Sequence, residues 1–437
     1  MAAKKVLLIG SGARENAISD ALLSGGAELY AFMPNKNPGI YKHCKEYATG
    51  KATDVAAVKA FASKIKPDLA VIGPEAPLEA GIVDELQQIG IGCFGPTREL
   101  AQLETSKAFT RQLLEKHKVG ASPKFKVFDK NSSSREIRYF LEELGEYVVK
   151  PDGLTGGKGV KVFGEHISSD EDAVRYCREI FQQNSSVIIE EKLEGEEFSL
   201  QSTTDGTTVI DCPPVQDHKR AFEGDTGANT GGMGSYSDAN HLLPFLKRVH
   251  IEQAHEITAK VASAIRKDHG SYKGVMYGGF ILTKKGVKLL EYNARFGDPE
   301  AMNVLPILKT NFVDICKAVA DSSLHKIKPA FERKATVCKY VVPEGYPDKP
   351  VTGKIEVPFC SPKSRALTFY ASVEEKKDGL YTTKSRAVAF VGVADNIESA
   401  ERIAEEAASK VKGAVYHRKD IGTNALIQKR VEHMGRL

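Results

Sequence analysis

The chain has 437 residues, of which 41% are hydrophobic and 27% charged, as in an ordinary globular protein of roughly two to four domains. Its net charge of +4 is spread without a basic block, so a nucleic-acid partner is not indicated, whereas small anionic substrates are compatible with it. The seven cysteines form no C-x-x-C pair, which argues against zinc and against a disulfide framework. The N-terminus enters a strand without a signal segment, and no apolar run is long enough for a membrane span, so we expect a cytoplasmic protein with no membrane partner.

The N-terminal part alternates short apolar segments with amphipathic ones, the pattern of a parallel α/β domain. The predicted strands are residues 6–9, 29–33, 69–72 and 93–94, and the predicted helices include residues 17–23, 54–65 and 79–89. In the first turn, Glu15 replaces the third glycine of the G-x-G-x-x-G fingerprint, and no acidic residue ends the second strand. NAD binding is therefore disfavoured, and we expect a phosphate on the backbone amides around Gly10 and Gly12.

A second polar turn follows the strand at residues 69–72, where ligands of such sheets bind. It contains Gly73, Pro74 and Glu75. A plain Gly-Pro turn accounts for the backbone but not for the carboxylate, so we interpret Glu75 as part of a binding site.

The middle of the chain carries two lysines and a glycine-rich loop suited to nucleotide phosphates. A helix predicted over 100–117 carries Lys107, for which a solvated surface lysine is the alternative, and a strand over 147–150 ends at Lys150. The loop at 152–160 lies between two predicted strands and lacks both the spacing and the hydroxyl of a P-loop. We expect it to close over the β and γ phosphates as a mobile lid. Its glycines and lysine are Gly153, Gly156, Gly157, Lys158 and Gly159.

The strand predicted over 187–191 turns into an acidic segment that could hold the nucleoside. Backbone groups from Glu191 to Leu193 could read the adenine edge, and Glu196 or Glu197 could bind the ribose hydroxyls. Read alone, the segment is only an acidic turn.

A long glycine-rich segment at 216–234 is predicted to be an irregular functional loop. Asp217 and Lys219 give it the mixed charge that suits a small zwitterion or a phosphosugar. His218 has no accompanying nucleophile motif, so we expect it to be solvated or to act indirectly rather than as a catalytic base.

Two further strands, predicted over 275–283 and 287–292, end in a run of polar side chains. Because side chains alternate faces along a strand, Glu291, Asn293 and Arg295 should form one wall. Carboxylate and amide oxygens are hard ligands for Mg²⁺, and an arginine can neutralise a phosphoryl group in transfer. The alternative is an edge strand with solvated charges, but the sharp Gly-Pro turn that presents Asp298 argues against it.

Beyond Pro329 the pattern changes to that of an α+β region with few convergent polar groups. The predicted strands are 336–342, 366–373 and 387–393, followed by a helix at 396–411 and a last helix. We expect this region to dock on the others and complete the site from outside.

Taken together, the chain resembles the phosphoribosylamine–glycine ligase family of ATP-grasp enzymes over nearly its whole length. The motifs that carry the likeness are GSGARENA, GPEAPL, LETSKAFT, KPDGLTGGKGV, IEEKLEGEEFS, QDHKRAFEGDTGANTGGMG, LEYNARFGDPE and RKDIG. The resemblance implies an α/β multidomain fold and a stand-alone enzyme, expected as a monomer with a weak dimer as the alternative. The implied domains are a Rossmann-like parallel-sheet domain at 1–104, an ATP-grasp domain at 105–330 with a lid at 123–193, and a C-terminal α+β domain at 331–437.

The implied reaction joins glycine to 5-phosphoribosylamine through a glycyl phosphate, giving glycinamide ribonucleotide, ADP and phosphate in purine biosynthesis. The implied cofactors are ATP and Mg²⁺ or Mn²⁺, and the implied catalytic residues are Arg295, Lys158 and Asp217. The metal would lie on Glu291 and Asn293, and ATP on Lys107, Lys150, the 153–159 loop, Glu191, Leu193, Glu196 and Glu197. The substrates would contact Asp217, Arg295, Gly12, Glu15, Gly73, Glu75, Lys219 and Asp298.

The chain departs from the family pattern at Ala13, Asn16 and Ala228. Ala13 adds a methyl group where the backbone would approach the phosphosugar, and Asn16 replaces a possible cation, so both bear on substrate affinity more than on chemistry. Two alternatives remain at this stage. One is another ATP-grasp ligase or carboxylase of purine metabolism; the other is a non-catalytic nucleotide sensor, which would not need metal ligands and substrate loops together.

Overall fold

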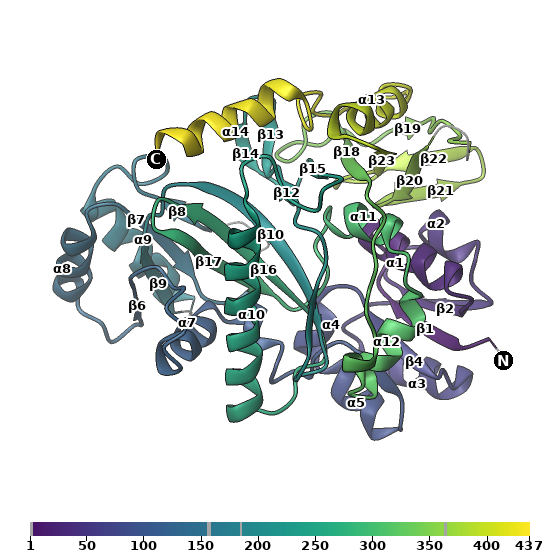
Figure 1. Cartoon of the computed structure of the whole chain (residues 1–437), viewed down its shortest axis with the longest axis horizontal. Helices are drawn as coiled ribbons and strands as arrows, with labels where there is room; N and C mark the ends of the chain where they lie inside the picture. Colours follow the sequence, from purple (N-terminus) through teal and green to yellow (C-terminus); the bar gives the residue numbers. More distant parts are fainter. Residues whose placement is uncertain (1–2, 155–158, 184–185, 362–364) are drawn as a thin grey trace.

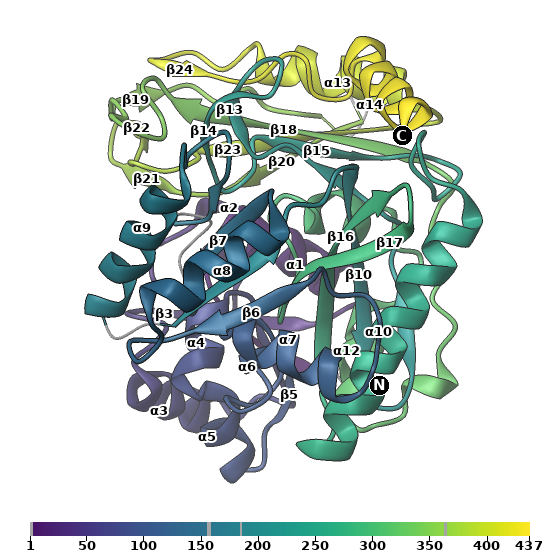
Figure 2. The same ribbon diagram turned by 90° about the vertical axis from the view of Figure 1, so that its left-hand side faces the viewer.

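The computed structural model describes residues 3–154, 159–183, 186–361 and 365–437, which fold into three α/β domains around a shared centre (Figures 1 and 2). The first domain is a parallel sheet, and its strands are β1 (Lys5–Ile9), β2 (Glu28–Met33), β3 (Glu46–Thr49), β4 (Leu69–Ile72) and β5 (Gly92–Phe94). Its helices are α1 (Ala13–Ser24), α2 (Pro38–Tyr41), α3 (Val55–Ile65), α4 (Glu75–Ala80) and α5 (Ile82–Gln88). The strand order is β3-β2-β1-β4-β5.

The apolar runs of this domain form its central strands, because helices cover both faces of a parallel sheet. Leu7 and Leu8, neighbours on β1, are both fully buried, each in a different core cluster. The helix predicted over 79–89 is wrong as a single element. Gly81 has a φ of +88°, a left-handed conformation that ends α4 and starts α5 in a new direction.

A small antiparallel sheet with two helices on one face forms the lid lobe, which projects at the left of Figure 1. Its elements are β6 (Phe125–Phe128), α8 (Ser134–Leu144), β7 (Tyr147–Pro151), β8 (Lys161–Val162), α9 (Asp170–Gln182) and β9 (Val187–Glu191). Val148 on β7 pairs with Val162 on β8, so the glycine-rich loop connects the two strands of a hairpin, as expected. Residues 155–158 lie outside the described part of this loop.

A second antiparallel sheet, of order β11-β10-β16-β17, faces the lid, and one long helix lies across it (Figure 2). Its elements are β10 (Glu196–Thr204), β11 (Val209–Asp211), α10 (Arg248–Asp268), β16 (Gly274–Thr283) and β17 (Gly286–Asn293). The connection from the first domain is α6 (Gln102–Thr105) and α7 (Lys107–Lys116). The continuous helix predicted over 100–117 is therefore wrong, because Ser106 is extended and its hydroxyl accepts a hydrogen bond from Phe109 N to cap α7.

The third domain is a mixed α+β unit whose main sheet has the path β12-β15-β18-β23-β20. Its elements are β12 (Gln216–Asp217), β15 (Gly234–Ser237), β18 (Ala335–Pro343), β19 (Lys354–Ile355), β20 (Ala366–Tyr370), β21 (Val373–Lys376), β22 (Gly379–Thr382), β23 (Val388–Ala394), α13 (Ile397–Ala408), β24 (Val415–Tyr416) and α14 (Asn424–Arg436). Two of the sheet strands come from the 216–237 segment, which also holds the hairpin β13 (Arg220–Phe222) and β14 (Thr226–Asn229). The expected irregular loop is thus largely paired, and the strand predicted over 366–373 is divided between β20 and β21.

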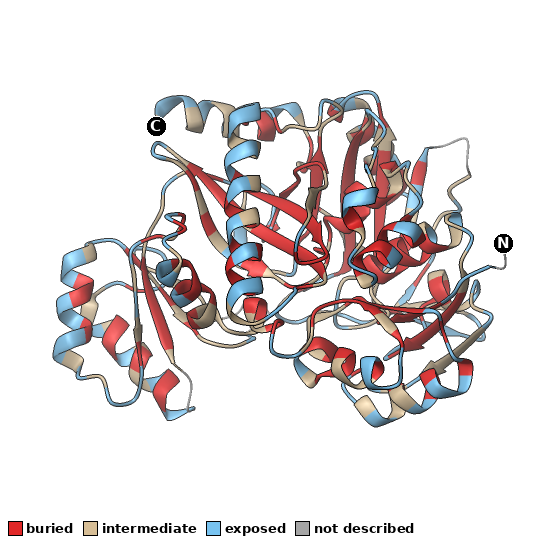
Figure 3. Ribbon diagram, turned by 60° about the horizontal axis from the view of Figure 1, so that its bottom comes forward, coloured by how far each residue is buried: buried red, intermediate tan, exposed pale blue. Residues whose placement is uncertain are grey.

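The three domains meet through short helices that follow the β17 strand. They are α11 (Ala301–Val304), η1 (Leu305–Ile307), α12 (Phe312–Ala320) and η2 (Leu324–Lys326), and α11 and α12 contact both α1 and neighbouring sheets. Figure 3 shows the sheets largely buried and α10 exposed along its outer side. Across the described ranges, we find no helix with the length and apolarity needed to cross a bilayer.

Candidate active site

The polar wall predicted at the end of β17 is present in the structure. Tyr292 and Ala294 are buried, whereas Glu291 is exposed and Asn293 and Arg295 are partly exposed. The alternation places the three polar side chains on one face, as strand geometry requires. Arg295 Nη2 donates to Asn293 Oδ1 at 3.1 Å, so these two side chains of the wall contact each other directly.

Glu291 is the carboxylate around which the cations of the site gather. Although the side chain is exposed, the surrounding protein removes part of its hydration, which by itself would raise its pKa. The positive charges of Lys219, Lys150, Lys107 and Arg295 outweigh that effect and lower the pKa of Glu291. Glu291 is therefore ionised in the neutral range. A surface of this kind, with several cations around one carboxylate, suits a metal ion bound together with phosphates.

Lys150 belongs to a buried ion cluster that the sequence analysis missed. Its Nζ lies 2.7 Å from Glu190 Oε2, while Arg111 Nε and Nη2 donate to the two Glu190 oxygens at 2.5 and 3.0 Å. The remaining donors of Arg111 reach the carbonyls of Leu289 and Leu290 at 3.0 and 2.8 Å. The cluster therefore joins the lid, α7 and the strand that carries Glu291. A charged residue inside the apolar run 187–191 was the signal that could have revealed it.

The pH dependence of stability should reveal this cluster. Burial alone would raise the pKa of Glu190, but Arg111 and Lys150 lower it from 4.5 to about 2. A depressed folded-state pKa stabilises the protein above the unfolded value, and this contribution is lost as the pH falls through the folded value. We expect the difference in unfolding free energy between the native chain and Glu190→Gln to be constant above about pH 4.5, the ordinary value. Toward pH 2 it should shrink by about 3 kcal/mol.

Urea unfolding at a series of pH values measures this difference. Glu143→Gln is the matched control, because Glu143 lies in the same lobe but forms an exposed pair with Lys124. Its variant should run parallel to the native protein at every pH. A Glu190→Gln curve that also stays parallel would contradict the prediction.

Both described ends of the glycine-rich loop are tied to helices. Lys107 Nζ donates to Gly153 O at 2.9 Å, and Asp152 accepts from Ser106 Oγ and from Ala108 N at 3.0 and 3.2 Å. At the other end, the Tyr176 hydroxyl on α9 donates to Gly159 O at 2.7 Å. The predicted phosphate contacts Gly156, Gly157 and Lys158 lie outside the described residues.

The segment predicted to hold the nucleoside connects β9 to β10. Glu191 is held at the lid, where its Oε1 accepts from Lys124 N at 2.9 Å, and Leu193 is partly exposed. Glu196 and Glu197 point in opposite directions, as neighbours on a strand do. Glu196 is buried, with His433 Nδ1 2.7 Å from its Oε1 and Arg430 Nε 3.5 Å from its Oε2, whereas Glu197 is exposed. Both cationic partners of Glu196 lie on α14, and Gln216 Nε2 also donates to its Oε2 at 3.5 Å, so its carboxylate is already occupied.

The predicted substrate residues Asp217 and Lys219 lie on this same side. Lys219 Nζ is 3.2 Å from Glu197 Oε2, and the charges of Glu197, Glu291 and Asp217 raise the pKa of this exposed lysine. Burial and the charge of Glu300 raise the pKa of Asp217 well above the ordinary aspartate range. Glu300 itself is buried, and the Tyr277 hydroxyl donates to it at 2.5 Å. Asp217 thus favours its protonated form more than an exposed aspartate does.

The phosphate site predicted on the first turn involves backbone amides that are hydrogen-bonded within the protein. Gly12 N donates to Glu15 Oε2 at 2.5 Å and Gly10 N donates to Phe32 O at 3.0 Å, so these amides already have partners. The Glu15 carboxyl group fills the space beside three glycines. A Cβ on Gly73 would lie 2.3 Å from Glu15 Oε1, and one on Gly10 would lie 2.6 Å from Glu15 Cγ. These glycines are therefore required for packing around Glu15.

Arg295 lies among carboxylates from two other segments. Its Nε is 3.3 Å from Glu75 Oε2 at the start of α4, and its Nη2 is 3.0 Å from Glu104 Oε1 on α6. Arg14 approaches Glu75 Oε2 at 4.0 Å and donates to Phe296 O at 3.2 Å. Burial would raise the pKa of Glu75, but the two arginines lower it to about 2. The first domain and the β17 wall therefore share one charge cluster.

The third domain reaches the site through Arg386, which the sequence analysis did not identify. Arg386 Nη2 is 3.0 Å from Asp298 Oδ2, and its Nη1 donates to Gly231 O and Gly232 O at 2.6 and 2.8 Å. The Tyr340 hydroxyl donates to the other oxygen of Asp298 at 2.5 Å. The expectation that this domain docks on the site is supported by these contacts. No local motif around Arg386 could have indicated it.

His218 and Asn16 are both buried, and this changes what was expected of each from the sequence. His218 is not solvated: it is 2% exposed, and burial lowers its pKa to about 3, so the ring is neutral. Asn16 is also buried, and its Oδ1 accepts from Tyr370 N at 2.9 Å on the third domain. Asn16 therefore links two domains. Ala13 is fully buried in α1, and Ala228 lies on the β14 hairpin strand.

Comparison with known proteins covers the whole chain. The N, ATP-grasp and C domains of phosphoribosylglycinamide synthetase match residues 4–104, 105–301 and 336–424. Phosphoribosylamine–glycine ligase of Methanocaldococcus jannaschii is 53% identical over 443 residues, covering 99% of each chain. The chain belongs to the phosphoribosylamine–glycine ligase family. The structure of the Thermotoga maritima phosphoribosylamine–glycine ligase has a TM-score of 0.80 at 28% identity and covers 95% of this chain and 100% of that one.

A more distant solved structure shares only the fold of this phosphoribosylamine–glycine ligase family member. It is the biotin carboxylase domain of the Hydrogenobacter thermophilus 2-oxoglutarate carboxylase, with a TM-score of 0.73 and 16% identity, covering 100% of this chain and 94% of that one. The predicted fold class and the predicted ligase activity in purine biosynthesis are confirmed. An NAD-dependent oxidoreductase and a non-catalytic sensor are thereby excluded. The match to the ATP-grasp domain of this family indicates that the reaction uses ATP.

The residues present fit a metal ion that is held partly by nucleotide. No group of three or more His, Cys, Asp or Glu within the described ranges could hold a metal by itself. Glu291 and Asn293 supply two oxygen donors, and the surrounding lysines would bind phosphates that supply others. Mg²⁺ in nucleotide sites is bound in this way, by one or two protein oxygens together with phosphates.

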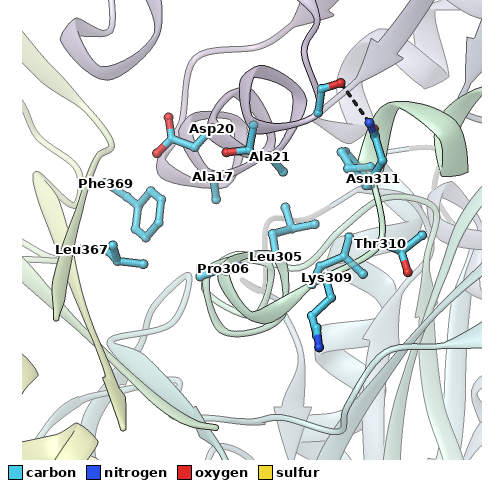
Figure 4. A pocket seen from close by; sticks show the side chains of 14 residues that line it. Ala17, Asp20, Ala21, Leu305, Pro306, Lys309, Thr310, Asn311, Leu367 and Phe369 are labelled. Carbon is cyan, nitrogen blue, oxygen red and sulfur yellow. Dashed lines mark hydrogen bonds between the residues drawn. The ribbon is translucent and has the colours of Figure 1, made fainter. Parts of the chain in front are cut away.

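A separate cavity of about 300 Å³ lies between α1, the 305–312 segment and β20 (Figure 4). Leu305, Leu367 and Phe369 form apolar walls, and Asp20 and Lys309 are its charged residues. None of the predicted site residues lines it. The cavity is therefore distinct from the β17 wall.

Proposed function

We propose that ATP binds between the lid sheet and the β17 sheet of this ligase, with its phosphates directed toward Glu291. The observation that carries this proposal is the set of positive charges from Lys219, Lys150, Lys107 and Arg295 acting on Glu291. Lys150, Lys219 and Arg295 each pair with a further carboxylate. Among the described residues, however, the Lys107 ammonium donates only to a backbone carbonyl, so an added polyanion fits beside it. Lys107 would exchange its bond to Gly153 O for a phosphate oxygen when the nucleotide arrives.

The metal would be held by Glu291 and Asn293. We propose Mg²⁺ as the natural ion, with Mn²⁺ as the alternative, because both donors are hard oxygens. A bound divalent ion neutralises phosphate charge and favours in-line transfer. Arg295 Nη2 donates to Asn293 Oδ1 at 3.1 Å, so the metal would share this oxygen with the guanidinium group.

The nucleoside would lie where the lid joins β10. Support comes from Glu191 and Leu193, which lie at the junction, and from Glu197, whose exposed carboxylate suits the ribose hydroxyls. Glu196 is the weaker candidate of the pair because His433 and Arg430 occupy it. The loop with Gly153, Gly156, Gly157, Lys158 and Gly159 would cover the phosphates and exclude water.

Glycine would lie between the wall and β12, with its carboxylate on Arg295 and its ammonium near Asp217. The carboxylate oxygen attacks the γ-phosphorus of ATP, so that ADP leaves and glycyl phosphate forms. The amine of phosphoribosylamine then attacks the acyl carbon, the C–N bond forms, phosphate leaves, and one proton is released from the nitrogen. Asp217 is suited to receive it because its pKa is raised. Arg295 would stabilise the charge on the acyl phosphate.

Phosphoribosylamine would bind between the first and third domains. The candidate residues are those of the two N-terminal turns together with residues from the neighbouring domains: Gly12, Glu15, Gly73, Glu75, Lys219 and Asp298. Glu75 is the best placed of them for the amine, because its side chain is 35% exposed and it already contacts Arg295. Arg386 and Tyr340 would orient Asp298 toward the sugar.

A substrate-omission assay tests this function. ADP release should require both glycine and freshly prepared phosphoribosylamine, and bicarbonate should not replace glycine. Release of ADP that is indifferent to glycine, or that bicarbonate supports, would show instead a carboxylase of the ATP-grasp type.

The domain boundaries, the oligomeric state and the cellular location remain predictions. The domain boundaries at 1–104, 105–330 and 331–437 are supported by the family matches at 4–104, 105–301 and 336–424. The lid at 123–193 is supported by its separate sheet of order β6-β9-β7-β8. Because β12 pairs with β15 and β15 pairs with β18, we propose that the third domain also includes residues 216–217 and 234–237. A monomer, with a weak dimer as the alternative, and a cytoplasmic location also stay predictions.

A further inference from the structure

A buried carboxylate lies directly behind the polar wall at the end of β17 and has no role in the proposed reaction. Glu104, on the short helix α6, has a side chain that is only 6% exposed. Its two oxygens have different partners: Oε1 lies 3.0 Å from Arg295 Nη2, and Oε2 accepts from Ala294 N at 2.7 Å. One side chain thus holds both the guanidinium of Arg295 and the backbone immediately before it.

The contacts of Glu104 also reach the proposed metal ligand. Arg295 Nη2, which faces Glu104, donates to Asn293 Oδ1 as well. Ala294, which Glu104 accepts from, lies between Asn293 and Arg295 in sequence. β17 ends at Asn293, so beyond that residue no strand partner orients the chain. Glu104 therefore takes the place of a strand neighbour at the point where the wall would otherwise be free to turn.

The second carboxylate on Arg295 differs from the first. Glu75 is 3.3 Å from Arg295 Nε, but its side chain is 35% exposed and also approaches Arg14 at 4.0 Å. Glu75 faces the open side, where a substrate amine can reach it, whereas Glu104 is enclosed. The Glu75 carboxylate is therefore accessible to ligands, whereas the Glu104 carboxylate contacts only protein groups among the described residues.

We infer that Glu104 is a positioning residue, which fixes Arg295 and the Asn293 amide in the geometry needed for transfer to the glycine carboxylate. The inference rests on the role proposed for Arg295. Burial raises the pKa of Glu104, yet Arg295, Arg14 and the Ala294 amide oppose that rise. A buried carboxylate without a cationic partner lowers the stability of the folded protein, and the contact with Arg295 offsets this effect for Glu104. Preorganisation of this kind affects the rate of the transfer more than nucleotide binding.

Glu104→Gln tests the inference because the amide is nearly isosteric and can still accept from Ala294 N. We expect kcat to fall by about 10- to 100-fold while the KM for ATP changes by less than about threefold. Glu99→Gln is the matched control, because Glu99 lies on the same connection but is 61% exposed and pairs only with His269 on the surface. Its kcat should equal that of the native enzyme. A native kcat in Glu104→Gln would overturn the inference.

A double-mutant cycle with Arg295→Gln separates positioning from a merely structural role. If Glu104 acts through Arg295, adding Glu104→Gln to Arg295→Gln should change kcat by less than about twofold. Equal effects in both backgrounds would overturn the inference. Should Arg295→Gln retain native turnover, the role proposed for Arg295 itself would be wrong. An inactive Arg295→Gln together with a fully active Glu104→Gln would remove only the positioning role.

Thermal unfolding provides a readout that does not depend on activity, and it applies even where Glu104→Gln alone folds poorly. In Arg295→Gln the Glu104 carboxylate is left buried without its cation, so the double variant should have a higher Tm than Arg295→Gln. A double variant whose Tm is equal or lower would contradict the coupling of these two side chains.

Discussion

Replacing Glu291 by Gln should lower kcat by about two to four orders of magnitude, because the amide removes the negative charge of a proposed metal ligand. The substitution keeps the size of the side chain, so the fold should be preserved. It also leaves Lys219, Lys150 and Lys107 without the carboxylate that they face. Nucleotide binding without metal should therefore be at least as tight as in the native enzyme.

The decisive measurement is calorimetric titration with ADP in the presence and absence of Mg²⁺. The native enzyme should bind ADP more tightly with Mg²⁺, and Glu291→Gln should lose most of this difference. Glu252→Gln is the control, because Glu252 is an exposed carboxylate on α10 whose ion-pair partner is Arg248. If Glu291→Gln kept both the metal effect and a kcat within about threefold of native, the metal would have to lie elsewhere.

Replacing Arg111 by Met should have the largest effect on stability, lowering the unfolding free energy by about 3–5 kcal/mol. The side chain is 3% exposed and makes two bonds to Glu190. Its loss leaves Glu190 with Lys150 alone and leaves the carbonyls of Leu289 and Leu290 without a donor. Buried acceptors that lose their partners account for part of the loss.

Urea unfolding measures the effect, and a second substitution identifies its origin. Adding Glu190→Gln to Arg111→Met removes a buried carboxylate that has lost its main partner, so the double variant should lose less than the sum of the two single variants. Arg138→Met provides the control, because the Arg138–Glu171 pair is exposed and spans 3.6 Å. Such a surface pair contributes about 0–1 kcal/mol. Additive losses from Arg111 and Glu190 would show that the two side chains do not act together.

Local chemistry in the sequence determined most elements and the wall at β17. Continuous apolar runs predicted the parallel strands, and alternation predicted that Glu291, Asn293 and Arg295 would share a face. The family motifs predicted the ligase activity, which the comparisons confirm. These features could be predicted because each depends on residues a few positions apart.

Prediction from local sequence patterns was wrong where one residue with a non-helical backbone conformation interrupts a stretch whose composition favours a helix. Gly81 and Ser106 each divide a stretch whose composition suits one helix, by a left-handed φ in the first case and an extended conformation in the second. The 216–234 segment was expected to be irregular because it is rich in glycine, yet β12 and β15, which begin at its two ends, belong to the main sheet of the third domain. Pairing with a distant sheet outweighs local composition.

Motifs and short-range patterns were enough to predict the family, most of the elements and the polar side chains of the β17 wall. Which charged side chains meet one another depends on the folded arrangement. Arg111 lies 79 positions from Glu190 in the sequence, and Glu104 lies 190 positions from Ala294. Arg386 reaches Asp298 from another domain. Ionic contacts between such distant segments leave no periodic signal in the chain, because burial and distance in the folded protein set their strength.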